Sequence, residues 1–395
     1  MRYLSADLVF PIHVLPISDG VVVVDDDGKI TDLLDPVKDE IPTSLPVEKF
    51  NGILCPGFVN THCHLELSHF KGKFSQKKGL PEFIGEMVEK RNGNNEEVQQ
   101  AMAEADNEMY ASGIVAVGDI SNEIVSSDIK QKSKIFYHTF VELFDIFPDR
   151  AESVFEKGRH IQNLFSKKGL NSSIVPHSLY TVTNPLMKLI YEYAKKSESI
   201  FCIHNQETLA EDEMFEKGTG KLIEKLQELT KAYGDWQPSG KSSLKTFMDQ
   251  FHPTIPLQLV HNTFTTLSDI RMMIQNPFPS YWCLCVKANL FIENKLPDIQ
   301  LLLKEKSILT VGTDSYASNS TLSIFKELQI IALKFPEIAL NEMLSWATLN
   351  GANFLCKANL FGSFEKGKIP GINLISNINL MELKLNSECK IVRLA

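Results

Sequence analysis

From Ile53 onward, eight short apolar runs alternate with longer stretches that have the spacing of amphipathic helices. Three of these helical stretches are Glu96–Tyr110, Asn184–Lys196 and Ser323–Lys334. Because parallel strands must be covered by helices, eight strand-then-helix units predict an α/β chain folded as a closed (β/α)8 TIM barrel. An open doubly wound sheet is the alternative, weakened because no G-x-G-x-x-G motif follows the first run. The eight runs are Ile53–Val59, Ile114–Asp119, Ile135–Val141, Ser173–Val175, Ile200–His204, Leu257–His261, Tyr281–Leu284 and Ile308–Asp314.

The two ends of the chain have a different pattern. Val21–Val24 and Lys29–Leu33 flank an Asp-Gly turn, which predicts a β-hairpin. The last section, Gly362–Ala395, reads as strand and lacks helical periodicity, so it is suited to pair with the N-terminal strands. We therefore expect a small composite β-sandwich domain from residues 1–55 and 362–395, and a barrel domain from residues 56–361.

Composition narrows the class of protein. The net charge of -9 argues against a nucleic-acid-binding surface. The seven cysteines are odd in number and include no C-x-x-C pair, which is typical of reduced thiols in the cytoplasm. The chain reaches Asp7 before any apolar run and has no membrane-length apolar stretch. These features predict a soluble cytoplasmic protein that acts on a small molecule, with no nucleic-acid or membrane partner.

The stretch Leu209–Thr254 is longer than one barrel helix requires. An insertion after a barrel strand lies at the C-terminal face, where active-site lids are found. A solvated surface helix with a loop explains the same composition, and both interpretations stay open.

Two histidines directly follow the first strand run, as His62-Cys63-His64. Residues two apart in an extended chain point to the same side, so both imidazoles can reach one metal ion. With ten histidines in the chain, this motif alone is weak.

Polar residues recur at the ends of other strand runs, where barrel active sites are built. A strand-end histidine can instead cap a backbone carbonyl, and an aspartate before a serine can cap a helix. A purely structural role is credible for one of these residues, above all for His177. It is not credible for all of them together. The residues are His177 after the fourth run, His204 at the end of the fifth with Glu207 three residues later, His261 at the end of the sixth and Asp314 at the end of the eighth.

This combination resembles the amidohydrolase superfamily, and more narrowly its mononuclear deaminase and chlorohydrolase branch. The resemblance rests on Pro-Gly-Phe-Val-Asn-Thr-His-Cys-His at residues 56–64, His-x-x-Glu at 204–207 and Gly-Thr-Asp-Ser at 312–315. Glycines at 351, 362 and 367 fit the same pattern. The resemblance covers essentially the whole chain.

The resemblance implies one divalent metal ion per chain, bound by His62, His64, His204 and Asp314. Zinc is the first choice and iron the second. Binuclear relatives carry a carboxylated lysine at the fourth strand end, where this chain has Pro176-His177, so a single ion is expected.

The same resemblance assigns the catalytic roles. Glu207 is the proton shuttle, His261 orients the water or the developing oxyanion, Asp314 completes the metal site, and His177 touches the substrate. The implied reaction is attack of metal-bound hydroxide on an amine-bearing ring carbon, followed by loss of ammonia.

The run His64–His69, with sequence HLELSH, is similar to that of aminodeoxyfutalosine deaminases and of S-adenosylhomocysteine- and adenosine-type deaminases. It implies that Glu66, Ser68 and His69 contact the substrate. The alternative is a loop or helix start with Glu66 exposed. Aromatic residues that could stack on a purine, or simply pack, are Phe83, Tyr180 and Trp236.

Two departures from the family pattern stand out. Cys63 lies between the first two histidines, and its side chain should point away from them. The segment after Gly367-Lys368 lacks the usual Ala-Asp pair, which puts the packing of the β-domain in question. The rival functions are removal of another leaving group, such as chloride, at the same site and a non-catalytic barrel. A homodimer is common in the family and is compatible with this sequence.

Overall fold

The computed structural model describes residues 1–42, 44–90, 95–234 and 236–395. Two four-stranded parallel sheets form its centre, with the strand orders β6-β7-β8-β9 and β10-β11-β12-β13. Most of their residues are buried, as expected for parallel strands covered on both faces. The predicted α/β class is confirmed, and each predicted run after the first corresponds to one parallel strand. The strands are β6 (Phe58–Cys63), β7 (Ile114–Ser121), β8 (Phe136–Leu143), β9 (Asn171–Pro176), β10 (Phe201–Asn205), β11 (Leu257–His261), β12 (Ser280–Leu284) and β13 (Ile308–Val311).

The two parallel sheets approach each other at both pairs of edges. A parallel bridge between Cys63 and Asp314 links the end of β6 to the segment after β13. A second parallel bridge, between Ser178 and His204, links the segment after β9 to β10.

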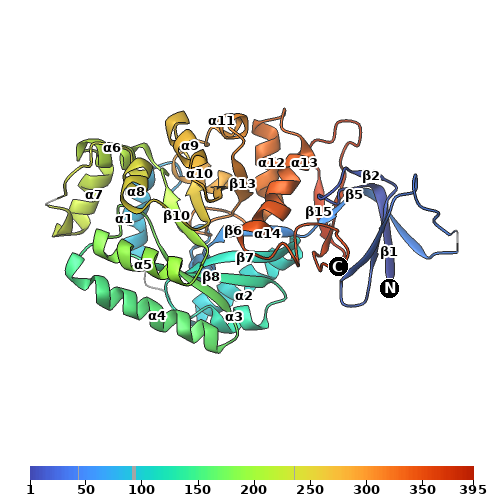
Figure 1. Cartoon of the computed structure of the whole chain (residues 1–395), viewed down its shortest axis with the longest axis horizontal. Helices are drawn as coiled ribbons and strands as arrows, with labels where there is room; N and C mark the ends of the chain where they lie inside the picture. The colour runs from blue at the N-terminus through green and yellow to red at the C-terminus, as the bar shows by residue number, and fades with distance from the viewer. Residues whose placement is uncertain (43, 91–94, 235) are drawn as a thin grey trace.

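Helices follow the parallel strands in sequence and lie around them (Figure 1). The helix predicted at Asn184–Lys196 has those bounds as α5, and it buries Leu186, Ile190 and Ala194 at helical spacing. Outside the stretch 209–254, the helices after β6 are η1 (Leu65–Phe70), α1 (Leu80–Lys90), α2 (Asn95–Ala111), α3 (Ser127–Lys132), η2 (Pro148–Arg150), α4 (Ala151–Lys167), α5 (Asn184–Lys196), α9 (Leu267–Ile274), α10 (Val286–Ile292), α11 (Ile299–Lys304), α12 (Ile324–Lys334), α13 (Leu340–Ser345), the π-helical η4 (Trp346–Asn350) and α14 (Gly351–Phe354).

A seven-stranded mixed sheet combines strands from both chain ends, at the right of Figure 1 near both termini. The predicted hairpin is present as β3 and β4, which pair antiparallel. The backbone of Gly367 and Lys368 also hydrogen-bonds to Ile30, so the unusual segment still packs against this sheet. The strands are β1 (Arg2–Val9), β2 (Ile17–Ser18), β3 (Val21–Val24), β4 (Ile30–Leu34), β5 (Val47–Pro56), β14 (Ile372–Ser376) and β15 (Lys390–Arg393).

The first predicted run, Ile53–Val59, needs a correction. It spans the end of β5, which pairs with β14 in the mixed sheet, and the start of β6, which pairs with β7. Gly57 separates them, and its N–H donates to the carbonyl of Pro370 at 2.9 Å. A Cβ at Gly57 would lie 2.3 Å from a side-chain carbon of Val115, so a glycine is required where the chain changes sheets.

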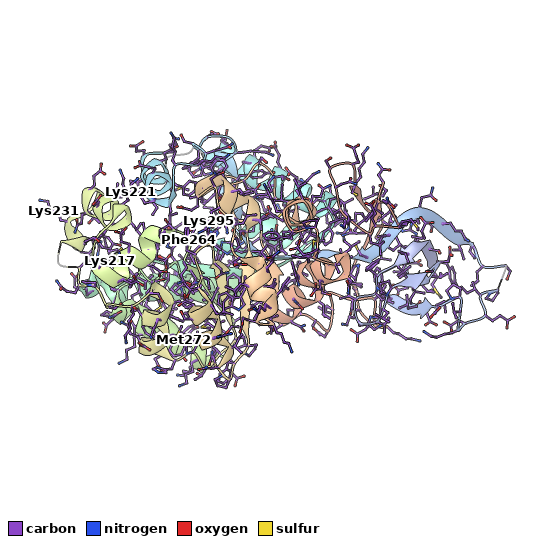
Figure 2. The ribbon with its side chains drawn as sticks, turned by 90° about the horizontal axis from the view of Figure 1, so that it is seen from above. Lys217, Lys221, Lys231, Phe264, Met272 and Lys295 are labelled. Atoms are coloured by element: carbon purple, nitrogen blue, oxygen red, sulfur yellow. The ribbon has the colours of Figure 1, made fainter. Side chains whose placement is uncertain are left out.

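The described part of the insertion Leu209–Thr254 contains helical segments joined by loops; residue 235 lies outside the described residues. The helical segments are α6 (Leu209–Lys217), α7 (Lys221–Leu229), η3 (Lys231–Tyr233) and α8 (Ser243–Phe251). Lys217, Lys221 and Lys231 are exposed on the outer side of this group (Figure 2). The surface-helix interpretation therefore describes its outer side, whereas Glu211 and Asp212 in the first turn of α6 are buried, and Glu211 accepts from the N–H of Glu207. Across the described ranges, no helix has the length and apolar character needed to cross a membrane.

Candidate functional site

Four side chains predicted as metal ligands converge at the C-terminal ends of the parallel strands. The Nε2 atoms of His62 and His64 are 3.1 Å apart. Asp314 Oδ1 lies 3.3 Å from Nε2 of His64 and 3.7 Å from Nε2 of His62. The ring centroid of His204 is 4.9 Å from that of His62. We call these four residues the histidine–aspartate cluster.

Small neighbours make room for the first histidine. Gly312 directly follows β13, and a Cβ at this position would lie 2.8 Å from Cβ of His62. A glycine is therefore needed there. The thiol of Cys63 contacts the sulfur of Met109 on α2 at 4.0 Å, away from the cluster. This orientation agrees with the expectation for the residue between the two histidines.

The backbone at three of the strand ends is left-handed. The φ angles are 44° at Gln206, 75° at His261 and 55° at Asp314. Non-glycine residues in this conformation are strained and are concentrated at functional sites, where the surroundings hold them in place. Here the strained positions carry or directly precede predicted site residues.

Hydrogen bonds fix the orientation of two cluster side chains. His204 Nδ1 donates to the carbonyl of His177 at 2.8 Å, which leaves the lone pair of its Nε2 free. Ser318 donates its hydroxyl to Oδ2 of Asp314, so Oδ1 is the oxygen directed at His62 and His64. Burial would raise the pKa of Asp314, but the hydrogen bond from His62 and the nearby imidazoles hold it well below its usual range.

The donor set fits a zinc or iron ion. Three imidazoles and one carboxylate are common ligands of these metals. Burial lowers the pKa of His64 to about 4, so its imidazole is neutral with a free lone pair. The ligand atoms of His62, His64 and His204 lie within 4.8 Å of one another. The spacing of 3.1 Å between Nε2 of His62 and of His64 is close to the roughly 3.3 Å expected of two nitrogens in a tetrahedral zinc shell.

Glu207 and His261 lie beside this cluster. Oε1 of Glu207 is 3.6 Å from Nε2 of His261, and the ring of His261 stacks on that of His204 at 5.4 Å. Burial raises the pKa of Glu207 to about 7. The preceding Gln206 donates its amide to Asp212 and Asp269, which anchors the turn that presents Glu207.

Asn289 on α10 fixes the tautomer of His261. Its Nδ2 donates to the backbone carbonyl of His261 at 3.1 Å, so its Oδ1 is left to accept from Nδ1 of His261 at 2.9 Å. Nε2 of His261 is therefore the unprotonated nitrogen of the neutral ring, and it is directed at Glu207.

The structure separates the residues predicted to contact substrate. The ring of His177 lies 4.6 Å from that of His204, and its Nδ1 bonds to the hydroxyl of Thr181. Glu66 is half-buried, so the alternative with an exposed side chain is wrong. Ser68 donates its hydroxyl to the carbonyl of Leu65, and His69 lies against Phe70 at 3.9 Å. His177 is thus near the cluster and Glu66 accepts from the backbone N–H groups of Asn122 and Glu123, whereas Ser68 and His69 make contacts within or beside the 3-10 turn.

The three candidate stacking aromatics have packing partners. Tyr180 is buried, Phe83 lies 5.1 Å from Phe74, and Trp236 lies 5.1 Å from Phe215. The packing alternative therefore describes these side chains as the structure has them.

Sequence reasoning missed an ion pair beneath the site. Asp119, at the end of β7, accepts from the N–H of Leu65 at 2.8 Å and pairs with Lys130 at 2.6 Å, with both side chains fully buried. This pair fixes the backbone directly after His64. Glu142, whose Oε1 lies 3.7 Å from Nδ1 of His204, was also missed. Asp119 ends a predicted strand run and Glu142 directly follows one, so the rule that selected His204 could have found both. No comparable signal marks Ser318 or Asn289.

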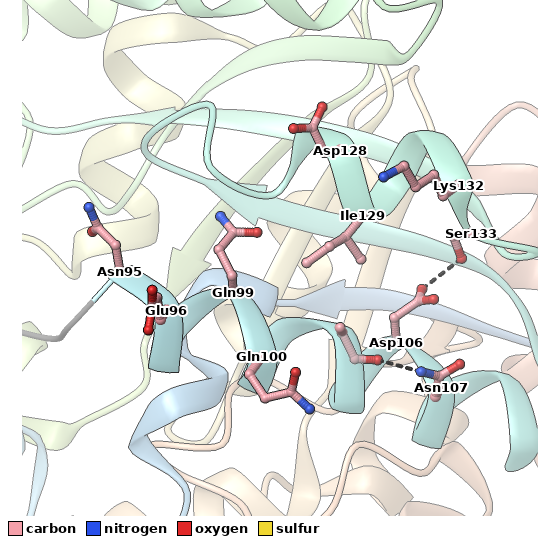
Figure 3. A pocket seen from close by; sticks show the side chains of 11 residues that line it. Asn95, Glu96, Gln99, Gln100, Asp106, Asn107, Asp128, Ile129, Lys132 and Ser133 are labelled. Carbon is pink, nitrogen blue, oxygen red and sulfur yellow. Dashed lines mark hydrogen bonds between the residues drawn. The ribbon is translucent and has the colours of Figure 1, made fainter.

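A surface groove lies away from the cluster. It has a volume of about 750 Å³ and lies between α2 and α3, lined by polar residues such as Gln99, Asp106 and Asp128 and by none of the predicted site residues (Figure 3). In the loop after β11, Phe264 donates its N–H to the carbonyl of Gln206, and the ammonium of Lys295, after α10, lies 4.2 Å from its ring centre (Figure 2).

Residues 53–392 match the amidohydrolase family. The chain belongs to this family. It is 26% identical over 326 residues to the adenosine deaminase of Helicobacter pylori, covering 80% of this chain and 77% of that protein. Its fold matches the crystal structure of Helicobacter pylori aminofutalosine deaminase in complex with methylthio-coformycin, with a TM-score of 0.83 and 23% identity over 100% of both chains. It also matches atrazine chlorohydrolase from Arthrobacter aurescens TC1 complexed with zinc, with a TM-score of 0.74 and 14% identity over 97% of this chain and 90% of that one.

These relatives confirm the family that the sequence pattern predicted. Both types of enzyme in the predicted branch, deaminases and chlorohydrolases, are found among them. The assignment of this member of the amidohydrolase family as a hydrolytic enzyme is confirmed with it.

Proposed function

We propose that this amidohydrolase is a hydrolytic deaminase of an adenine-type nucleoside, such as aminodeoxyfutalosine, and that it uses one divalent metal ion. The observation that carries the proposal is Glu207 beside His261, 3.6 Å apart at the edge of the histidine–aspartate cluster. The names of the similar adenosine deaminase and aminofutalosine deaminase support the substrate class.

We further infer that the two parallel sheets are halves of one (β/α)8 barrel. The parallel bridges at Cys63–Asp314 and Ser178–His204 support closure at both seams. In this division, residues 56–361 form the barrel and residues 1–55 with 362–395 form the composite β-domain, supported by the pairing of β5 with β14. The barrel directs the C-terminal ends of its strands to a common face, where the cluster lies.

The proposed ion is held by His62, His64, His204 and Asp314. Zinc, which the similar chlorohydrolase structure holds, is the first choice and iron the second. Bound there, such an ion acts as a Lewis acid and lowers the pKa of a water ligand toward about 7.

The roles of the protein side chains follow from their placement. Glu207, with its pKa raised to about 7 by burial, is suited to take a proton from the attacking water and return it to the substrate. His261 can accept from the attacking water at Nε2 in its neutral form, and in its protonated form it can donate from Nε2 to the developing oxyanion. His177 lies on the opposite side of His204, where we place a substrate contact.

We expect Asn289→Leu to lower kcat about 10- to 100-fold, the usual effect of removing a hydrogen-bond partner that orients an active-site histidine. Leucine has a similar volume but cannot accept from Nδ1 of His261, so the ring loses its fixed tautomer. Asn289→Asp is the matched variant, because it keeps the acceptor. Steady-state kinetics should show a kcat defect in Asn289→Leu that Asn289→Asp largely restores. Equal defects in both variants would instead indicate that the bond to the His261 carbonyl matters.

A substrate screen tests the proposed function. The metal-loaded protein should release ammonia from adenine-bearing nucleosides, including adenosine, 5'-deoxyadenosine and aminodeoxyfutalosine, and lose this activity after chelation. Zinc should restore it to the chelated protein.

Chloride release from a chlorotriazine, without ammonia release from any nucleoside, would overturn the proposal in favour of the chlorohydrolase alternative. A metal-free protein that is inactive on the whole panel after zinc addition would favour the non-catalytic alternative.

A further inference from the structure

Two glutamates near the cluster each have one buried oxygen without a hydrogen-bond partner in the described part of the chain. They are Glu142, at the end of β8, and Glu66, two residues after His64. In each carboxylate the unpartnered atom is Oε1. Glu142 is only 4% exposed. Because buried carboxylate oxygens are normally hydrogen-bonded, two open acceptors at one site require an explanation.

The two carboxylates are held in place by one residue. Asn122 donates its backbone N–H to Oε2 of Glu66 at 3.0 Å, and its side-chain amide to Oε2 of Glu142 at 3.2 Å. The N–H of Glu123 also donates to Oε2 of Glu66. One oxygen of each glutamate is thus anchored, and the other is left open.

The open oxygen of Glu142 is directed at the site. It lies 3.7 Å from Nδ1 of His204, and it forms a group within 4.8 Å with atoms of His177 and His204. The single hydrogen on Nδ1 of His204 already bonds to the carbonyl of His177 at 2.8 Å. In the described part of the chain, protein donors therefore do not satisfy Oε1 of Glu142. Glu142 faces the site from the β8–β9 side, whereas Glu207 follows β10 and His261 ends β11.

The ammonium group near these carboxylates is paired elsewhere, which leaves their open oxygens to a donor from the ligand. Lys130 pairs with Asp119 and donates to the hydroxyls of Ser121 and Thr139. The open oxygen of each glutamate can accept a hydrogen bond, and a neutral hydroxyl group is a suitable donor.

We propose that Oε1 of Glu66 and Oε1 of Glu142 form a subsite that accepts hydrogen bonds from two adjacent hydroxyl groups, those at the 2' and 3' positions of a ribonucleoside. This inference rests on the proposed function, because an adenine-type base at the cluster places its sugar as the next group outward. It makes the two glutamates determinants of sugar specificity.

The test compares nucleosides that differ only in the sugar. Adenosine, 2'-deoxyadenosine, 3'-deoxyadenosine and 2',3'-dideoxyadenosine are assayed for ammonia release with the zinc-loaded wild-type protein. A hydrogen bond to a charged group corresponds to about a 10- to 100-fold change in kcat/KM, so kcat/KM should fall by about that factor for each hydroxyl removed.

The variants Glu66→Gln and Glu142→Gln identify the acceptors. Each should lower kcat/KM for adenosine but change it little for the dideoxy substrate, which has nothing to lose. Glu156→Gln is the matched control, because that side chain is exposed on α4 and pairs with Arg159. Zinc content should remain at one ion per chain in all three variants.

Equal kcat/KM values for adenosine and its dideoxy analogue in the wild type would overturn the subsite and leave the deaminase proposal standing. Equal losses on both sugars in the two glutamine variants would indicate a structural role and also overturn it. Faster turnover of 2'-amino-2'-deoxyadenosine than of adenosine would overturn the hydroxyl assignment, because it would show that the two glutamates prefer an ammonium group. No ammonia release from any nucleoside would overturn the proposed function and this inference with it.

Discussion

Asp314→Asn is expected to lower kcat more than about 10³-fold and to release the metal ion. The ion supplies several kcal/mol of transition-state stabilisation, and about 1.4 kcal/mol corresponds to a tenfold change in rate. Oδ2 of Asp314 is occupied by the hydroxyl of Ser318, so Oδ1 is the oxygen available to a metal. An amide at this position binds metal weakly and places a donor nitrogen near the imidazoles of His62 and His64.

The measurements are the metal content per chain by elemental analysis and the rate of ammonia release. Asp249→Asn is the matched control, because Asp249 is half-exposed and pairs with Lys241 on the surface. Circular dichroism of both variants separates metal loss from unfolding. One ion per chain and full activity in folded Asp314→Asn would show that Asp314 is not a ligand.

Much of the site could be predicted because strand ends are visible in sequence. His62 and His64 follow an apolar run, His204 and Asp314 end one, and parallel strands bring such positions to one face. The residues that orient them could not be found this way. Ser318 lies in the loop after β13 and Asn289 on α10, so their contacts depend on loop and helix placement that local periodicity does not report.

The limits of the fold prediction have a similar cause. The run Ile53–Val59 is continuously apolar because both β5 and β6 are buried, so hydrophobicity does not reveal that the chain passes from one sheet to another at Gly57. The left-handed backbone at His261 and Asp314 is equally invisible, since neither residue type requires it. That conformation depends on the surrounding tertiary structure.

Glu207→Gln is expected to lower kcat about 10²- to 10⁴-fold, the usual contribution of general acid–base catalysis. Glutamine has nearly the same shape but cannot take a proton from water and return it to the substrate. Because Glu207 is not one of the four proposed ligands, the variant should still hold one ion per chain. This retention of metal distinguishes it from Asp314→Asn.

The control for this prediction is Glu216→Gln, which is exposed on helix α6, the helix that begins two residues after Glu207. Single-turnover measurements of ammonia release should show a slower chemical step in Glu207→Gln, with little change in the binding of substrate. Wild-type kcat in a folded, metal-loaded Glu207→Gln protein would remove Glu207 from the proton-transfer role. The buried carboxyl beside His261 would then need another explanation. A carboxyl whose pKa is raised to about 7 by burial lowers the stability of the folded protein at neutral pH, and such groups are concentrated at functional sites.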